Sequence, residues 1–221
     1  MPIESETLRR IPLFATLSPQ DLAQVAMLTV ERHYERGDLI LLEGDQGGAL
    51  HYVQSGLVKV FKTSAAGKEQ VLRLIAPGHT FNDVPALDGG PNPASVAAME
   101  PSVIYVIRRT ELRKLIMTRP EFADAVVQTL ASALRHLVAL VEDLSLRHVA
   151  ARVAKILLDQ DASSSELHAH HLTQQEMAAL AGTAREVVGR ALKELEEAGA
   201  IEMRQGRAVV LSRERLRLLS S

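Results

Sequence analysis

The chain has 221 residues, 47% of them hydrophobic and 24% charged, and its formal net charge at pH 7 is −2. This length and composition indicate an ordinary globular protein of two modest domains, and so small a net charge gives no electrostatic sign of a nucleic-acid binder. Because cysteine is absent, disulfides, thiolate zinc sites and cysteine-held iron-sulfur clusters are excluded.

The N-terminal part of the chain predicts a helix followed by a sheet domain. Ser18 and Pro19 form a typical helix start, and apolar residues repeat after them at helical spacing. From residue 30 to 108, short apolar segments alternate with glycine turns, which is typical of a small jelly roll of two sheets. We therefore expect residues 1–118 to form a jelly-roll domain.

A long helix is predicted within residues 119–146, beginning at Pro120. Its apolar residues follow the three-and-four alternation of a coiled-coil seam. They are Phe122, Val126, Leu130, Ala133, Leu137, Leu140 and Leu144. Because such a stripe needs a partner surface, we expect it to form the dimer interface of a homodimer. The alternative is that the stripe packs only against the jelly roll of its own chain.

The C-terminal part, residues 147–221, predicts two short helices around a glycine turn, followed by a hairpin. Thr173 and Glu176 make a capping box at the start of the first helix, Gly182 ends it, and the second begins at Thr183. This layout is typical of a winged helix-turn-helix that binds DNA. The residues placed to contact DNA are Thr173, Gln175, Thr183, Arg185, Glu186, Gly189, Arg190 and Lys193, with Arg207 at the tip of the hairpin.

The residue types on the second helix suit the reading of base edges. A guanidinium can donate two parallel hydrogen bonds to guanine, and a carboxylate can accept one from cytosine. Arg185, Glu186 and Arg190 are the candidates for this role. The alternative is a polar helix that is merely solvated, but it does not account for the glycine turn and the hairpin on either side.

At these residues the chain resembles the Crp/Fnr family of bacterial transcription regulators, and the resemblance runs from about Leu13 to Leu211. The recognition-helix signature of that family, Arg-Glu, two residues, Gly-Arg, appears here at residues 185–190. The resemblance implies an α+β fold with an N-terminal β jelly roll, a long dimerisation helix and a C-terminal winged helix-turn-helix.

The same resemblance implies partners. Arg185 and Arg190 would contact guanines and Glu186 a cytosine, so that a homodimer binds a TGTGA-like palindrome in double-stranded DNA. RNA polymerase is a further partner by family resemblance, and a small-molecule effector of unknown identity would control the regulator.

The expected effector pocket departs from the family pattern. Cyclic-nucleotide-binding members hold the ribose with Gly-Glu and the phosphate with Arg-Ser or Arg-Thr, whereas the aligned pairs here are Asn82-Asp83 and Pro93-Ala94. Because the strongest contacts to a cyclic phosphate are missing, we expect an effector other than conventionally bound cyclic AMP. The predicted pocket residues are Arg73, Phe81, Asn82, Asp83, Pro93, Ala94, Ser95, Leu137 and Val138.

The ligand of this pocket and the role of Arg73 stay open. Its apolar helix residues suit a planar ligand, and heme is possible by resemblance to gas-sensing members of the family, with His51, His79 or His136 as axial ligand. Arg73 either binds an anion inside the barrel or extends to solvent at its rim. The pocket could also be degenerate and bind no effector, which is the alternative to a ligand-controlled regulator.

Other function classes find little support in the sequence. A metal-dependent jelly-roll enzyme needs a cluster of histidines with a carboxylate, and no phosphate loop, nucleophile elbow or HExxH pattern appears, so we expect no catalysis. His168, His170 and His171 are expected to be solvated, and no metal site is predicted.

Because no uninterrupted apolar run is long enough to cross a bilayer and residues 1–14 lack a signal-peptide core, we expect a cytoplasmic protein.

Overall fold

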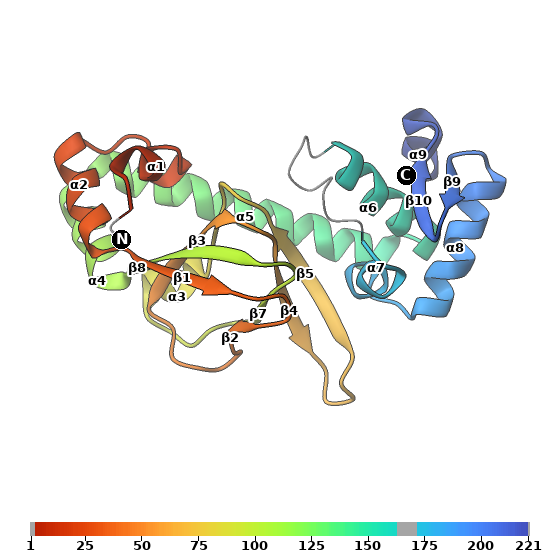
Figure 1. Cartoon of the computed structure of the whole chain (residues 1–221), viewed down its shortest axis with the longest axis horizontal. Coiled ribbons are helices and arrows are strands. Elements are labelled where there is room, and N and C mark those ends of the chain that lie inside the picture. The colour runs from red at the N-terminus through yellow and green to blue at the C-terminus, as the bar shows by residue number, and fades with distance from the viewer. Residues whose placement is uncertain (1–2, 163–171, 221) are drawn as a thin grey trace. The chain divides into compact units, whose positions relative to one another are not determined.

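A computed structural model describes residues 3–162 and 172–220 of the chain (Figure 1). By packing, the chain divides into two units, one made of residues 1–62 and 73–136 and the other of residues 63–72 and 137–221. The domain boundaries expected near residues 118 and 146 stay predictions. The predicted histidine loop around His168 lies outside the described residues.

Two four-stranded sheets make up the jelly roll, with strand orders β1-β8-β3-β6 and β2-β7-β4-β5. The bounds are Val30–Tyr34 for β1, Leu39–Leu41 for β2, Ala49–Ser55 for β3, Val58–Thr63 for β4, Glu69–Ile75 for β5, Thr80–Phe81 for β6, Ser95–Ala98 for β7 and Ser102–Arg108 for β8. Side chains alternate between the two faces of a strand, and the inward faces bury Val53, Val58, Ile75, Phe81, Val96 and Ile104. The predicted double-sheet architecture is thereby confirmed.

Helices cover one end of these sheets, where α1, α2 and α4 gather in Figure 1. The bounds are Ser5–Arg9 for α1, Pro12–Phe14 for the 3-10 turn η1, Pro19–Leu28 for α2, Asp83–Asp88 for α3, Arg109–Thr118 for α4 and Pro120–Leu146 for α5. Ser18 caps α2 as predicted, because its Oγ accepts a hydrogen bond from the backbone N of Asp21 at 3.2 Å. The short helices α1 and α3 were not predicted.

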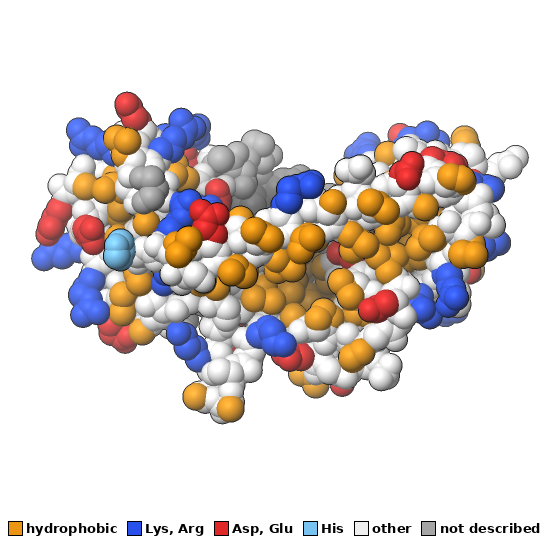
Figure 2. Space-filling model, turned by 180° about the vertical axis from the view of Figure 1, so that it is seen from behind, with side chains coloured by type: hydrophobic (Ala, Val, Ile, Leu, Met, Phe, Trp, Pro, Cys, Tyr) orange, Lys and Arg blue, Asp and Glu red, His pale blue; other side chains and the backbone are white. Residues whose placement is uncertain are grey.

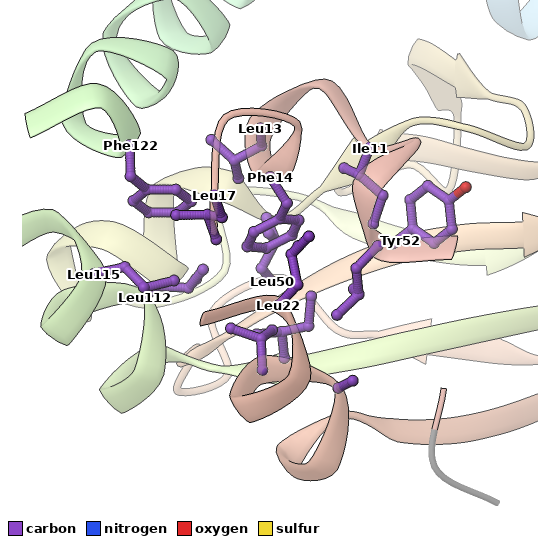
Figure 3. Close-up of a cluster of buried hydrophobic side chains, with 14 of the residues drawn as sticks. Ile11, Leu13, Phe14, Leu17, Leu22, Leu50, Tyr52, Leu112, Leu115 and Phe122 are labelled. Atoms are coloured by element: carbon purple, nitrogen blue, oxygen red, sulfur yellow. The ribbon is translucent and has the colours of Figure 1, made fainter. Parts of the chain in front are cut away.

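The start of α5 belongs to a second apolar cluster under these helices (Figure 3). Phe122 is fully buried and stacks on Phe14, with 5.6 Å between the ring centroids. Leu112 and Leu115 of α4 and Leu50 of β3 fill the space around the two rings. The N-terminal turns of α5 are therefore anchored in the core of their own chain.

The C-terminal residues form a compact winged helix-turn-helix. Its elements are α6 (Val149–Ala162), α7 (Gln174–Ala181), α8 (Arg185–Glu197), β9 (Ile201–Arg204), β10 (Arg207–Val210) and α9 (Arg213–Leu219). The first three of these helices share one core, which includes Val153, Leu157, Met177, Val188 and Leu192. The helix α9 was not predicted, and Leu216 is its buried contact with this core.

Helix α5 has one property that was not predicted from the sequence. Although polar and charged residues interrupt its apolar runs, by length and composition alone it is apolar enough to cross a membrane, with a window of mean hydropathy 1.3. The apolar residues are numerous because the helix carries two apolar faces, one of which buries Phe122 and Val126 in the jelly-roll unit. A single helix of this kind is weak evidence for a membrane.

Candidate nucleic-acid interface and ligand cleft

The turn between α7 and α8 has the predicted capping chemistry. Thr173 Oγ1 accepts from the backbone N of Glu176 at 3.2 Å, and Glu176 Oε2 accepts from the backbone N of Thr173 at 2.7 Å. Gly182 ends α7 with a left-handed φ of 65°, which a residue without Cβ adopts at no steric cost. Helix α8 begins at Arg185, two residues later than predicted, so Thr183 lies in the turn and donates its backbone N–H to Ala178 O at 3.0 Å.

The two faces of α8 separate apolar from polar side chains as predicted. Val188, Ala191, Leu192 and Leu195 are buried. Among the residues predicted to contact DNA, Thr173, Gln175, Arg185, Glu186, Arg190, Lys193 and Arg207 are exposed, whereas Thr183 and Gly189 are half-buried. Within residues 3–162 and 172–220, no side-chain hydrogen bond or ion pair engages Arg185, Glu186 or Arg190. These three side chains are free to bind a partner.

The hairpin β9–β10 closes with a two-residue turn. Gln205 and Gly206 both have positive φ, 50° and 78°, which is the signature of a type I′ turn. Arg207 begins β10 opposite Arg204, so it lies next to the tip rather than at it. Arg204 and Arg207 are both exposed, but Arg204 is paired with Glu202 at 2.6 Å, and within the described residues no ion pair engages Arg207.

A cleft of about 580 Å³ opens in the first unit alongside α5. Its lining comes from the N-terminal turn, from the β5–β6 region and from one face of α5. The lining residues with polar side chains are Arg73, His79, Thr80, Asp83, Gln128, Thr129, Ser132 and His136. By area, polar atoms make up the smaller part of a mainly apolar wall, and the cleft is large enough for a small organic ligand.

The acidic group of this cleft is Asp83, at the first turn of α3. Thr80 Oγ1 donates a hydrogen bond to Asp83 Oδ1 at 2.9 Å. Burial raises the pKa of the Asp83 carboxyl above its usual range, while the Thr80 hydrogen bond and the positive charge of Arg73 act in the opposite direction. The ionised carboxylate is thus incompletely compensated inside the chain.

Of the predicted effector-pocket residues, Arg73 and Asp83 line this cleft and the remainder lie elsewhere. Phe81 points into the jelly-roll interior. Asn82 has a left-handed φ of 63° and donates its side-chain amide to Ala49 O at 3.2 Å. Arg73 and Asp83 are thus the members of the predicted set that share this cleft.

The positions aligned with the phosphate-binding pair are engaged within the chain. Pro93 is exposed, and its carbonyl oxygen accepts from Lys62 Nζ at 3.2 Å. Ala94 and Ser95 are buried, and Ser95 Oγ accepts from the backbone N of Glu43 at 3.0 Å. Leu137 and Val138 are exposed on α5, 49% and 61% respectively.

The sequence prediction named His136 but missed Gln128 and Ser132 on the α5 wall of the cleft. Gln128, Ser132 and His136 repeat at spacings of four, which places them on one ridge of a helix. That spacing was visible in the sequence, but Thr80 and the N-terminal turn reach the same cleft only through the fold.

Comparison with known proteins now settles the family. Residues 31–119 match the cyclic nucleotide-binding domain and residues 151–219 match the Crp-like helix-turn-helix domain. The chain is 35% identical over 198 residues to the Cyclic AMP receptor protein of Thermus thermophilus, covering 88% of this chain and 90% of the relative. The chain belongs to the Crp/Fnr family of transcription regulators. Members of this family are regulators with a DNA-binding helix-turn-helix, not enzymes.

Other Crp/Fnr proteins extend this result. A CRP-like cAMP-activated global transcriptional regulator of Mycobacterium tuberculosis is 32% identical over 213 residues, which cover 94% of this chain and 95% of the relative. The solved Catabolite Activator Protein of Thermus thermophilus is 32% identical with a TM-score of 0.54, covering 95% of this chain and 98% of that chain. FixK2 from Bradyrhizobium japonicum, 22% identical with a TM-score of 0.75 over 87% of this chain and 98% of that chain, shows the same fold.

Heme, which gas-sensing Crp/Fnr members bind, does not fit the cleft. His79 and His136 line it, and His51 is enclosed in the barrel with its ring stacked on Phe81 at 5.0 Å. The propionates of a heme could pair with Arg73, but a porphyrin offers no cation to Asp83, which would be left as a charged group against an apolar macrocycle. Among the described residues, no group of three or more histidines and carboxylates could hold a metal ion.

Crp/Fnr proteins typically act as dimers, and the long helix α5 is the expected interface. In this chain α5 carries two apolar faces, one buried and one exposed. Of the predicted seam, Phe122 and Val126 are buried in the jelly-roll unit and Leu130 packs against them, while Ala133, Leu140 and Leu144 are half-buried. The large apolar side chains left exposed on α5 are Val127, Leu134, Leu137, Val138, Val141 and Leu146. Figure 2 shows hydrophobic side chains gathered along this helix.

Proposed function

We propose that the chain is a homodimeric regulator that reads a TGTGA-like palindrome in double-stranded DNA through α8. The observation that carries the proposal is that Arg185, Glu186 and Arg190 share the exposed face of α8 and are engaged by no other side chain of the described residues. A guanidinium kept free in this way retains the fork geometry needed for the guanine edge. Arg207 on the wing would add a phosphate contact.

The exposed stripe of α5 supports the dimer. Val127, Leu134, Val138 and Val141 follow one another at spacings of seven, four and three and are each about 60% exposed. Paired helices bury such a stripe by knobs-into-holes packing. Because Phe122 and Val126 already belong to the core, we place the interface on this neighbouring stripe. A two-fold dimer would present its two α8 helices to half-sites about one DNA turn apart.

An effector other than conventionally bound cyclic AMP completes the proposal. The relatives named above include a cyclic AMP receptor and a cAMP-activated regulator, but the pair Pro93-Ala94 brings no guanidinium and no hydroxyl to a phosphate. We place the regulator in the cytoplasm with RNA polymerase as a partner. A regulator that needs no effector is the remaining candidate, favoured by the internal engagement of Asn82 and Ser95.

Fluorescence anisotropy on a labelled TGTGA-type palindrome tests the DNA-reading role. Arg185→Ala and Arg190→Ala should each weaken binding by about 1 to 3 kcal/mol, whereas Arg217→Ala, an exposed arginine of α9 in the same unit, should leave it unchanged. Binding should also weaken steeply as salt rises. Unchanged affinity and sequence preference in both α8 variants would overturn the proposal.

A further inference from the structure

The cleft beside α5 has the features of a built ligand site. Its groups come from segments far apart in the chain, with Arg73 and Asp83 on one wall and Gln128, Ser132 and His136 on another. Within the described residues, no hydrogen bond or ion pair ties the Arg73 guanidinium or the side chains of Gln128 and Ser132. A half-buried guanidinium without a partner favours a ligand that supplies one, and the exposed Gln128 and Ser132 are free to add contacts to it.

The charges of the cleft limit the class of ligand. Among its lining residues, Arg73 is the one Lys or Arg and Asp83 is the one Asp or Glu. A phosphate ester would find a single guanidinium and would be repelled by the neighbouring carboxylate. A simple carboxylate would satisfy Arg73 but leave Asp83 without a cation. A ligand that carries both a carboxylate and an ammonium group matches both residues.

The rest of the lining indicates an aliphatic body for this ligand. Ile11, Pro12, Leu13, Ala125 and Ala133 give the cleft its apolar wall, and no Phe, Tyr or Trp is among its lining residues. A nucleobase usually stacks on an aromatic ring, and this cleft offers imidazoles alone for that purpose. Small apolar contacts and neutral hydrogen-bonding groups suit an amino-acid side chain.

The cleft stays accessible if two chains pair through the exposed stripe. With about 100° of rotation per residue, the ridge of Gln128, Ser132 and His136 lies about 150° around α5 from the stripe of Val127, Leu134, Val138 and Val141. A second helix seated on that stripe would therefore contact the other side of α5. The ligand site and the proposed dimer interface use different faces of one helix.

We propose that this cleft binds a free amino acid, with the carboxylate on Arg73, the ammonium group on Asp83 and the remaining polar atoms on Gln128 and Ser132. Such a ligand would act as the effector of the regulator, and that part rests on the proposed function. Binding itself does not depend on DNA. The position of α5 as one wall of the cleft gives an amino acid a direct contact with the proposed dimerisation helix.

Thermal melting and calorimetry of the full chain with each of the twenty common L-amino acids test the site. At least one should raise the melting temperature in proportion to its concentration. Arg73→Gln and Asp83→Asn should each weaken its binding at least tenfold, whereas Arg113→Gln, an exposed arginine of α4 outside the cleft, should not. The deaminated acid and the decarboxylated amine of the same ligand should bind at least tenfold more weakly than the amino acid.

Several results would overturn the proposal. These are no binding by any amino acid, equal binding of the deaminated acid, and full binding by both cleft variants with their fold intact by circular dichroism. Cyclic AMP binding that is lost in the same variants would also overturn it. Arg185→Ala should bind the amino acid normally while losing DNA, so a failure of the DNA-reading role and a failure of the ligand site give different patterns.

Discussion

The charged side chains of helix α8 and those of the cleft beside α5 differ in their exposure and in their partners within the chain. Arg185 and Arg190 stand exposed without internal partners, while Asp83 is half-buried, bonded to Thr80 and influenced by Arg73. Exposed charges contribute little to folding and can be kept for a partner. Buried polar groups are coupled to the free energy of folding. Substitutions on α8 should therefore change binding alone, whereas those in the jelly-roll unit should also change stability.

The largest expected effect is on stability, from Phe122→Ala in the core where α5 begins. Phe122 is fully buried against Phe14, and removing such a ring costs about 3 to 5 kcal/mol of unfolding free energy. Urea unfolding followed by circular dichroism measures it. Val127→Ala, on the exposed stripe of the same helix, should change the value by less than about 0.5 kcal/mol in a monomeric background. Equal losses of unfolding free energy in Phe122→Ala and Val127→Ala would contradict the assignment of one buried and one exposed face to α5.

The buried imidazole of His51 should make stability depend on pH. Burial lowers the pKa of His51 from its usual 6.5 to about 4 and outweighs the opposite influence of the Ala49 backbone. The folded state favours the neutral ring. The contribution of His51 to the free energy of unfolding is therefore complete above about pH 6.5 and is lost as the pH falls towards 4.

Between pH 6.5 and pH 4 this loss of unfolding free energy amounts to about 3 kcal/mol. His51→Leu, of similar volume, should remove this part of the acid destabilisation when unfolding is compared between pH 7 and pH 4.5. The exposed His33→Leu, on β1, serves as control. Identical pH profiles for wild type and His51→Leu would show that the ring is not held neutral.

Leu134→Glu should break the proposed dimer. This side chain is 63% exposed on the apolar stripe, and two opposed carboxylates in a helix seam would raise the dimer dissociation constant at least about tenfold, or 1.4 kcal/mol. Analytical ultracentrifugation measures it. Arg135→Glu changes charge on the next residue, outside the stripe, and should leave the dimer intact. A wild-type chain that is monomeric would remove the interface altogether.

The smallest expected effect concerns cyclic AMP. Because the aligned residues Pro93 and Ala94 provide no phosphate contact, adding cyclic AMP should change neither the melting temperature nor the affinity for the palindrome. The visible spectrum of the purified protein should likewise show no Soret band. A cyclic AMP-dependent rise in DNA affinity would contradict our interpretation of the pocket.

The helix-turn-helix of α7 and α8 could be predicted because the contacts that form it are local in sequence. Thr173, Glu176 and Gly182 fix their helix and turn through contacts within a few residues, and the Arg185 to Arg190 motif is contiguous in sequence. The start of α8 was predicted two residues too early, because nothing in the sequence distinguishes Thr183 in the turn from a first helical residue.

The cleft could not be predicted in the same way. It brings the N-terminal turn, the β5–β6 region and α5 together across long stretches of chain. The aligned motif located Asp83, strand alternation located Arg73, and His79 and His136 were named as pocket histidines, but the other lining residues were not predicted. The predicted seam on α5 shares Phe122 and Val126 with the core for a related reason. Both apolar stripes have helical spacing, and only the tertiary packing of Phe122 and Val126 shows which one the core takes.

The most direct test of the DNA-reading role combines a protein change with a base change. Anisotropy titrations would compare the TGTGA palindrome with probes in which each guanine of the half-site is replaced in turn, for wild type and for Arg190→Ala. Wild type should lose about 1 to 3 kcal/mol at the guanine that Arg190 contacts, and Arg190→Ala should lose nothing there while still discriminating at the other guanine. Full discrimination at every position by the variant, or none by the wild type, would contradict the account.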